Sequence, residues 1–164
     1  SMVCIGFGQG ISPIVSICWG AKEKETAIKI RSITNRILLA IGTLTALSFF
    51  VAGKRYAEIF GCSNSIADMV ATGFRIYAIT FLVMGYDVTG SMYFTSCGDA
   101  KSSAIISSLR GIVLLLAFIL IFPAIFGMNG VWMASPFAET LTSIVTFVLI
   151  RRQVRKNKEE ENAR

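Results

Sequence analysis

The sequence contains no histidine, and no two of its four cysteines stand in CxxC spacing. Zinc sites are built from Cys and His at short spacings, and Ser–His or Cys–His nucleophile pairs need an imidazole base. The residues therefore offer neither a metal-ligand cluster nor a nucleophile–base pair. We expect no metal, no cofactor and no enzymatic activity.

Charged residues are scarce as well. They make up 16% of the chain, whereas about 25% is usual for a soluble domain. The formal net charge is nevertheless +6, which raises the question of a nucleic-acid partner. Outside the apolar runs the basic residues are not interleaved with aromatic ones, as a nucleic-acid surface requires, so we expect no nucleic-acid partner.

The chain is instead rich in apolar sequence, at 54% hydrophobic residues. Five long apolar runs cover residues 2–20, 37–53, 69–97, 104–127 and 130–150. Each has about the length that a helix needs to cross a hydrocarbon core of ~30 Å. A helix that is apolar all round lies in a membrane or inside a much larger core, and 164 residues cannot supply that core for five helices. The sequence predicts an all-α, polytopic transmembrane helix bundle at 1–152 and a charged tail at 153–164.

The basic residues are unevenly distributed between the two ends of these runs. Thirteen of the sixteen lie in the breaks at 21–36 and 98–110 or in the C-terminal tail, and only three lie on the other side. Loops rich in Lys and Arg stay in the cytoplasm. We therefore expect a multi-pass protein of the plasma (inner) membrane with a cytoplasmic C-terminus. Residues 54–61 have an amphipathic pattern, which predicts a short helix at the outer interface.

Two acidic residues, Asp87 and Glu139, fall well inside apolar runs. A charge at the bilayer centre costs ~2.5–3.5 kcal/mol on insertion scales. Such a carboxylate must pair, bind a cation or be protonated, because desolvation favours the neutral form. Tyr86, Thr89 and Tyr93 stand near Asp87 in the sequence and add oxygen atoms. These five residues form the predicted cation- or substrate-binding group.

A structural interpretation of the two acids stays open. Asp87 could be an interhelical hydrogen-bond partner, and Arg75 or Arg110 could neutralise one of the carboxylates. The first apolar run poses the same choice, since Gln9 and Ser12 either hydrogen-bond across a helix interface or line a polar cavity. We include both in the candidate site.

Several strings in this order resemble the multidrug and toxic compound extrusion (MATE) family of secondary transporters. They are Gly8-Gln-Gly-Ile-Ser-Pro13, Gly85-Tyr-Asp87 with Tyr93-Phe94, Leu109-Arg110, Asn129-Gly-Val-Trp132 and Ala138-Glu139. The resemblance implies a fold of twelve helices in two lobes, which exports amphiphilic drugs or metabolites against sodium or proton entry. It also implies that this chain supplies the last five helices of the second lobe, as a C-terminal fragment, and that the remaining helices of the transporter are its partners.

Two other functions are compatible with the sequence. The first is a lipid-linked sugar flippase of the same superfamily, although such proteins tend to carry more basic residues in the cavity. The second is a small, self-contained membrane scaffold of five spans, which the short length favours. Further spans encoded upstream in the same reading frame would favour the transporter.

Overall fold

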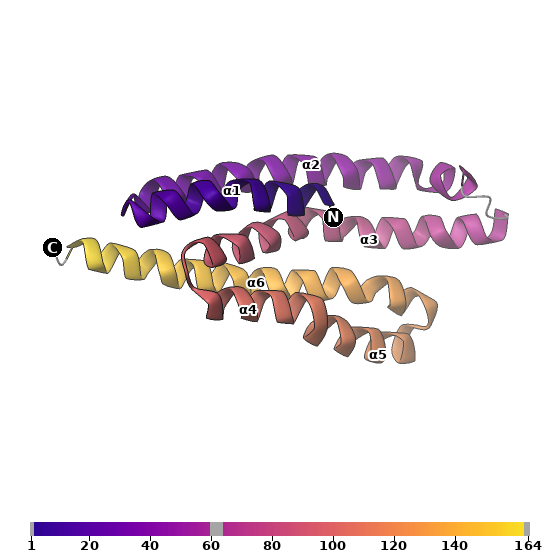
Figure 1. Ribbon diagram of the computed structural model, residues 1–164. Coiled ribbons are helices and arrows are strands. Elements are labelled where there is room, and N and C mark those ends of the chain that lie inside the picture. The colour runs from indigo at the N-terminus through magenta and orange to yellow at the C-terminus, as the bar shows by residue number, and fades with distance from the viewer. Residues whose placement is uncertain (1, 60–63, 163–164) are drawn as a thin grey trace.

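The computed structural model describes residues 2–59 and 64–162, and every element in these ranges is a helix (Figure 1). Five helical stretches are long and apolar enough to cross a membrane. The predicted all-α polytopic bundle is therefore confirmed. The elements are α1 (Met2–Gly20), α2 (Lys24–Ile59), α3 (Asn64–Ser96), α4 (Ala100–Ser108), the π-helical turn η1 (Leu109–Val113), α5 (Leu114–Phe126) and α6 (Met128–Asn162).

Helix α2 begins thirteen residues before the apolar run that predicted it. The charged stretch before residue 37 is helical because it is amphipathic. Ala27, Arg31, Thr34 and Leu38 follow one another at helical spacing, and all four are buried. The charged residues between them lie on the other face, so a count of apolar residues places the helix start too late.

The C-terminal ends of α2 and α6 also differ from the predicted boundaries. The expected interface helix at 54–61 is not separate, since α2 continues without a break to Ile59; residues 60 and 61 lie outside the described part of the chain. The tail also continues α6, which is helical to Asn162. Neither segment contains a Gly or Pro among its described residues that would end a helix.

The turns after α1 and α3 have the same construction. Lys22 and Gly98 each adopt a positive φ, of 65° and 78°. The following residues donate back into the helix, from Glu23 N to Cys18 O and from Asp99 N to Phe94 O, at 2.9 Å each. This Schellman pattern satisfies the last carbonyls of a helix. Asp99 then caps α4, accepting a bond from the backbone N of Ser102 at 3.2 Å.

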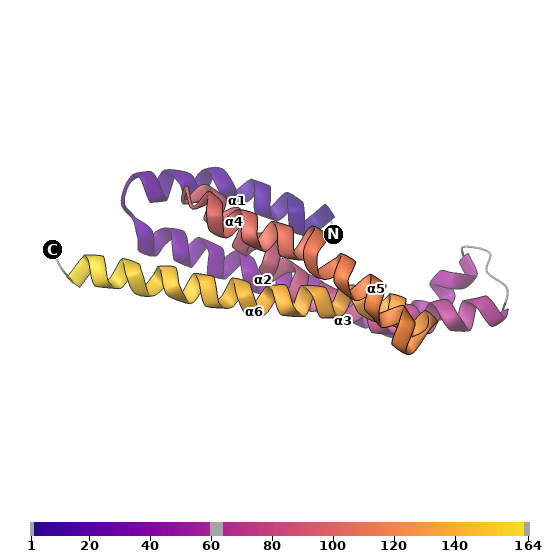
Figure 2. The ribbon, with the colours of Figure 1, turned by 90° about the horizontal axis from the view of Figure 1, so that it is seen from below.

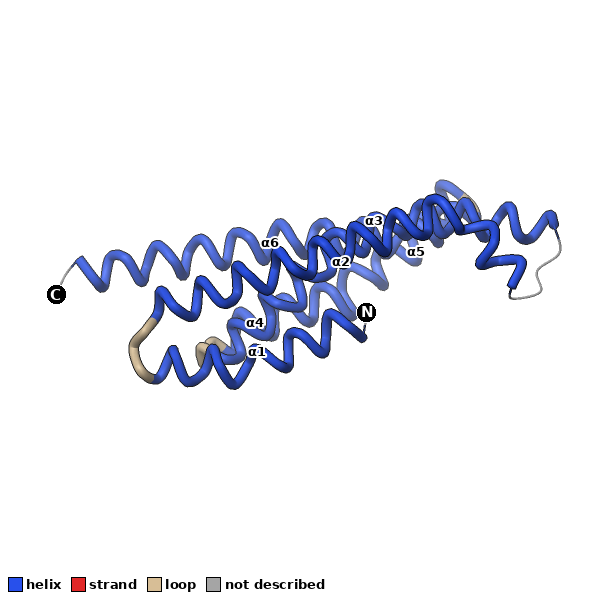
Figure 3. Tube along the Cα trace, turned by 90° about the horizontal axis from the view of Figure 1, so that it is seen from above, coloured by secondary structure: helices blue, strands red, loops and turns tan. Residues whose placement is uncertain are grey.

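Helix α3 is the centre of the bundle, in contact with α1, α2, α4 and α6. In Figure 1, α1 and α2 lie on one side of it, and α4, α5 and α6 lie on the other. The views in Figures 2 and 3 show that α1 and α4 share one face of the bundle, while α2 and α6 share the opposite face. The central helix is therefore covered by different partners on its two faces.

The interface between α3 and α6 is polar and closely packed. The buried side chains include Asp87 on α3 and Thr146 on α6. A Cβ on Gly90 would overlap the Thr146 methyl group, so the two backbones can approach this closely only with glycine there. Ser143 bonds to Asp87 across the same interface. Small and hydroxyl-bearing residues hold membrane helices together in this way. We call Asp87, Gly90, Ser143 and Thr146 the α3–α6 seam.

Candidate cation-binding cavity

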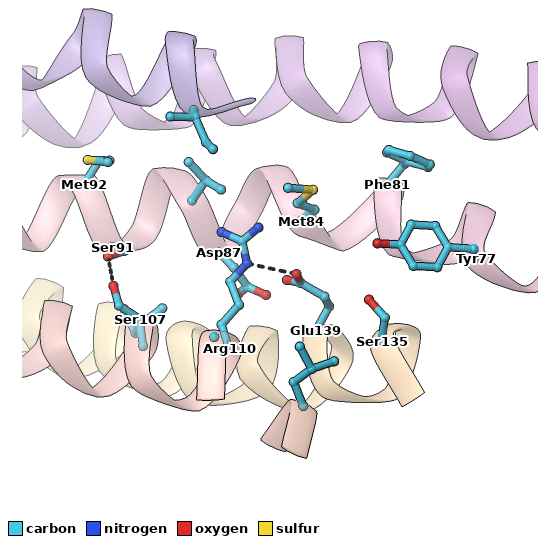
Figure 4. A pocket seen from close by; sticks show the side chains of 15 residues that line it. Tyr77, Phe81, Met84, Asp87, Ser91, Met92, Ser107, Arg110, Ser135 and Glu139 are labelled. Atoms are coloured by element: carbon cyan, nitrogen blue, oxygen red, sulfur yellow. Dashed lines mark hydrogen bonds and ion pairs between the residues drawn. The ribbon is translucent and has the colours of Figure 1, made fainter. Parts of the chain in front are cut away.

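A cavity of about 610 Å³ lies over the middle of α3, between α1 on one side and α4, η1, α5 and α6 on the other (Figure 4). Seven of the fifteen residues that line it come from one face of α3. The side chains that line it are Ile5, Tyr77, Phe81, Met84, Asp87, Val88, Ser91, Met92, Ile106, Ser107, Arg110, Gly111, Leu115, Ser135 and Glu139. It is thus an apolar cavity with a few polar groups, as small-molecule sites usually are.

Asp87 is fully buried, with none of its surface exposed. Its Oδ2 atom accepts a hydrogen bond of 2.9 Å from the Ser143 hydroxyl on α6. Its Oδ1 atom is also buried and has no hydrogen-bond partner among the described residues. A buried carboxylate with one oxygen left unsatisfied is costly. This oxygen is therefore a candidate ligand for a bound cation.

Glu139 is paired with a cation. Arg110 Nε donates to Glu139 Oε1 at 2.9 Å, and both side chains are largely buried (Figure 4). The possibility that Arg110 neutralises one of the two acids is therefore confirmed for Glu139. The second oxygen, Oε2, is buried and lacks a partner among the described residues. Arg75, the other candidate for this role, is exposed.

Arg110 extends from a local change in helix geometry. The span that contains it runs as α4, η1 and α5, and the N–H of Leu114 bonds to the carbonyl of Leu109, five residues back. This i→i+5 pattern defines a π-helical turn, which often occurs at functional sites. The turn supplies both Arg110 and Gly111 to the cavity wall.

Three predicted oxygen donors do not line the cavity. The ring of Tyr86 lies beneath the Arg31 guanidinium, 5.3 Å from the ring centroid. Thr89 donates to the carbonyl of Gly85 in its own helix at 2.8 Å. Tyr93 is buried in a separate cluster with residues of α1 and α2. Proximity in the sequence to Asp87 was a poor guide here.

The geometry of α3 explains this outcome. Successive residues of an α-helix are rotated by about 100°, so side chains three or four positions apart share a face. Met84 and Ser91 stand at these spacings from Asp87, and both line the cavity. The helical spacing was the signal that could have found them. Ser107 was also missed; it shares a hydrogen bond of 2.8 Å with Ser91 (Figure 4).

The two candidates on α1 also lie away from the cavity. Gln9 is exposed. The hydroxyl groups of Ser12 and Ser96 share a hydrogen bond of 2.7 Å that joins α1 to α3. Of the two interpretations of Ser12, this geometry favours helix packing. The described residues contain no group of three or more Cys, Asp or Glu side chains that could hold a metal ion.

Comparison with known proteins shows the family to which this chain belongs. The model of the MatE family matches residues 1–121, well over half of the chain. The chain belongs to the MatE family. The multipass membrane fold and the MATE resemblance of the sequence are thus confirmed together, while its position in the second lobe stays a prediction.

Two bacterial relatives of this MatE chain are similar along nearly all of its length. It is 19% identical over 154 residues to the multidrug export protein MepA of Staphylococcus aureus, which covers 91% of this chain and 33% of MepA. It is 26% identical over 161 residues to the probable multidrug resistance protein YoeA of Bacillus subtilis, covering 94% and 34%. The chain spans about a third of the length of these relatives. No solved structure matches it significantly.

Proposed function

We propose that this chain is part of an efflux transporter that exports amphiphilic drugs or metabolites in exchange for sodium ions or protons. Membership of the MatE family supports transport over a scaffold role, and the relatives named for multidrug export support efflux. The remaining helices of the transporter would complete the substrate pathway.

The observation that carries the coupling proposal is the state of Asp87. Its carboxylate is fully buried in the bundle, bonded to one neutral hydroxyl, and directed into a cavity with one oxygen unsatisfied. A charge at this depth is stable only when it is neutralised. A sodium ion or a proton can supply this neutralisation and leave again, so occupancy by the cation becomes linked to the conformation of the bundle.

The cavity is less suited to a lipid-linked sugar flippase. Lipid-linked sugars carry phosphate groups, which basic side chains recognise. Among the described residues that line the cavity, Arg110 is the only basic one, and it already pairs with Glu139. The cavity therefore favours a cationic or neutral ligand over a phosphate.

The test is Asp87→Asn in the complete gene product that contains this chain. Asn keeps the shape and the hydrogen bond but cannot carry the charge. The variant should fold and reach the membrane, yet lose the dependence of efflux on the sodium or proton gradient. Asp68→Asn is the matched control, since Asp68 lies on the same helix in an exposed ion pair with Lys54. Normal gradient-driven efflux by Asp87→Asn at equal expression would remove Asp87 from the mechanism.

The orientation in the membrane is a further part of the proposal. The distribution of Lys and Arg supports a cytoplasmic position for the α1–α2 turn and the C-terminus. Single cysteines at Glu25 and at Arg55, both exposed, should react with an impermeant thiol reagent from opposite sides in an otherwise cysteine-free protein. Reaction of both from the outside would contradict this orientation.

A further inference from the structure

The candidate site holds three ionisable side chains, two acidic and one basic. Asp87 and Glu139 are acidic, Arg110 is basic, and all three line the same cavity. When all three are ionised, the net charge of the group is minus one. The described residues that line the cavity include no further charged side chain.

The three side chains are not equivalent in their contacts. Arg110 is bonded to Glu139, whereas Asp87 is bonded to a neutral hydroxyl. Figure 4 shows Arg110 bonded to Glu139, with Asp87 on the wall of the same cavity. Asp87 also lies within electrostatic range of both partners. Arg110 is therefore bonded to one of the two carboxylates and interacts with the other only through space.

We propose that Arg110 sets the charge of this site, so that it accepts one monovalent cation at a time, at Asp87. The inference rests on the cation-coupled function proposed above. Arg110 acts as a fixed internal cation that occupies Glu139, and only Asp87 is left to exchange sodium or a proton. Glu139 in turn holds Arg110 away from Asp87. Arg110 and Glu139 are thus positioning residues, which determine the number and valence of the bound ions.

This arrangement has a consequence that a purely structural ion pair does not have. Glu139→Gln leaves Arg110 without its carboxylate partner, and the guanidinium then has Asp87 as the nearest one. A buried charge seeks a partner because an unpaired one is strongly unfavourable. The internal pair of Arg110 and Asp87 is neutral, so cation binding is lost although Asp87 itself is intact.

Removal of the arginine has the opposite effect. Arg110→Gln leaves two carboxylates and a net charge of minus two, so the site takes up a second monovalent cation or one divalent cation. The double variant Arg110→Gln/Glu139→Gln leaves Asp87 as the single charge. It should bind one cation again, as the unmodified protein does. If Arg110→Gln restores the cation binding that Glu139→Gln removes, the two residues act through the charge of the site and not through packing.

The experiment measures binding of sodium, of calcium and of protons to the purified complete gene product, by isotope equilibrium binding and by proton release on addition of sodium. The unmodified protein should bind one monovalent cation per chain. Affinity for the monovalent cation should fall by about tenfold or more in Glu139→Gln, because the cation must then displace Arg110 from Asp87 and a charge-assisted contact has this size. The affinity should recover in the double variant. Arg110→Gln should gain calcium binding. Arg75→Gln is the control, because Arg75 is an exposed arginine on α3.

The outcomes separate this inference from the proposed function. If the unmodified protein binds neither sodium nor protons at Asp87, the coupling function fails and the inference fails with it. If it binds one cation but Glu139→Gln binds equally well, or the double variant does not recover, the function stands and the role of Arg110 is wrong. Circular dichroism confirms folding of each variant; should Arg110→Gln not fold, Glu139→Gln and the double variant still decide.

Discussion

The α3–α6 seam and helix α5 are opposite in chemistry and in burial. The seam is polar and buried, with Asp87 and Thr146 inaccessible. Helix α5 consists of Leu, Ile, Phe, Ala and one Pro, and none of its side chains is buried. In a soluble protein the assignment would be reversed. Lipid tails are as apolar as Leu, so apolar side chains gain little by leaving them, and polar contacts and close packing hold the helices together.

The difference between the seam and α5 shows where a membrane helix bundle can accommodate a buried ionisable group. Polar groups that stabilise the seam also create the only kind of environment in which a buried carboxylate is tolerable. The cavity meets this seam at Asp87, and the only residue of α5 that lines it is the apolar Leu115. The seam therefore combines packing with the candidate function, whereas the apolar side chains of α5 stay exposed in the described bundle.

The largest expected effect on stability comes from comparing a buried and an exposed residue of the same membrane span. Ile106, on α4, has no exposed surface and packs with Phe94 and Ile150, whereas Leu120, on α5, is 74% exposed. Ile106→Ala should lower the free energy of unfolding by about 2 kcal/mol or more, because it leaves a void in a packed cluster. Leu120→Ala should change it by a few tenths of a kcal/mol at most, as expected for a lipid-facing side chain. Unfolding in mixed micelles measures both.

Equal losses for the two variants would show that α5 packs as tightly as α4 in the native protein. The contrast in burial between α4 and α5 would then not describe the molecule in its membrane.

A smaller effect is expected for the seam's hydrogen bond. Ser143→Ala removes the hydroxyl that donates to Asp87 Oδ2 at 2.9 Å. Hydrogen bonds between membrane helices average ~0.6 kcal/mol and reach ~1.7 kcal/mol, and a charged acceptor places this one at the upper end. The control is Ser135→Ala. Ser135 also lies on α6, and it lines the cavity. A loss of stability as large in the control would indicate that Asp87 does not depend on Ser143.

The sequence predicted the spans well because hydropathy reports directly on lipid-facing surfaces. The run 104–127 is predominantly apolar, and its part from 111 on is apolar all round. It forms one continuous helical stretch at Ala100–Phe126. For the same reason the apolar run 37–53 covers only part of α2. Its first turns are amphipathic and mix charged residues with buried Ala27 and Arg31, so the average hydropathy is low although the helix is unbroken.

The candidate site was predicted only in its charged members. Asp87 and Glu139 could be chosen because an acid in an apolar run is rare and costly. Their partners depend on how helices distant in the sequence rotate against each other. The contact of Arg110 with Glu139 spans 29 residues and passes through a π-helical turn, and that of Ser143 with Asp87 spans 56. No periodic pattern in a single sequence predicts either contact.

The most direct test of the account is whether the carboxylate of Asp87 itself changes state when the coupling cation exchanges. Infrared difference spectroscopy on the complete gene product, recorded between sodium-free and sodium-loaded states and between two pH values, reports on carboxyl groups. We predict a carboxyl difference band that is absent in Asp87→Asn and unchanged in Asp68→Asn. An identical band in the unmodified protein and in Asp87→Asn would contradict the assignment of the exchanging charge to the α3–α6 seam.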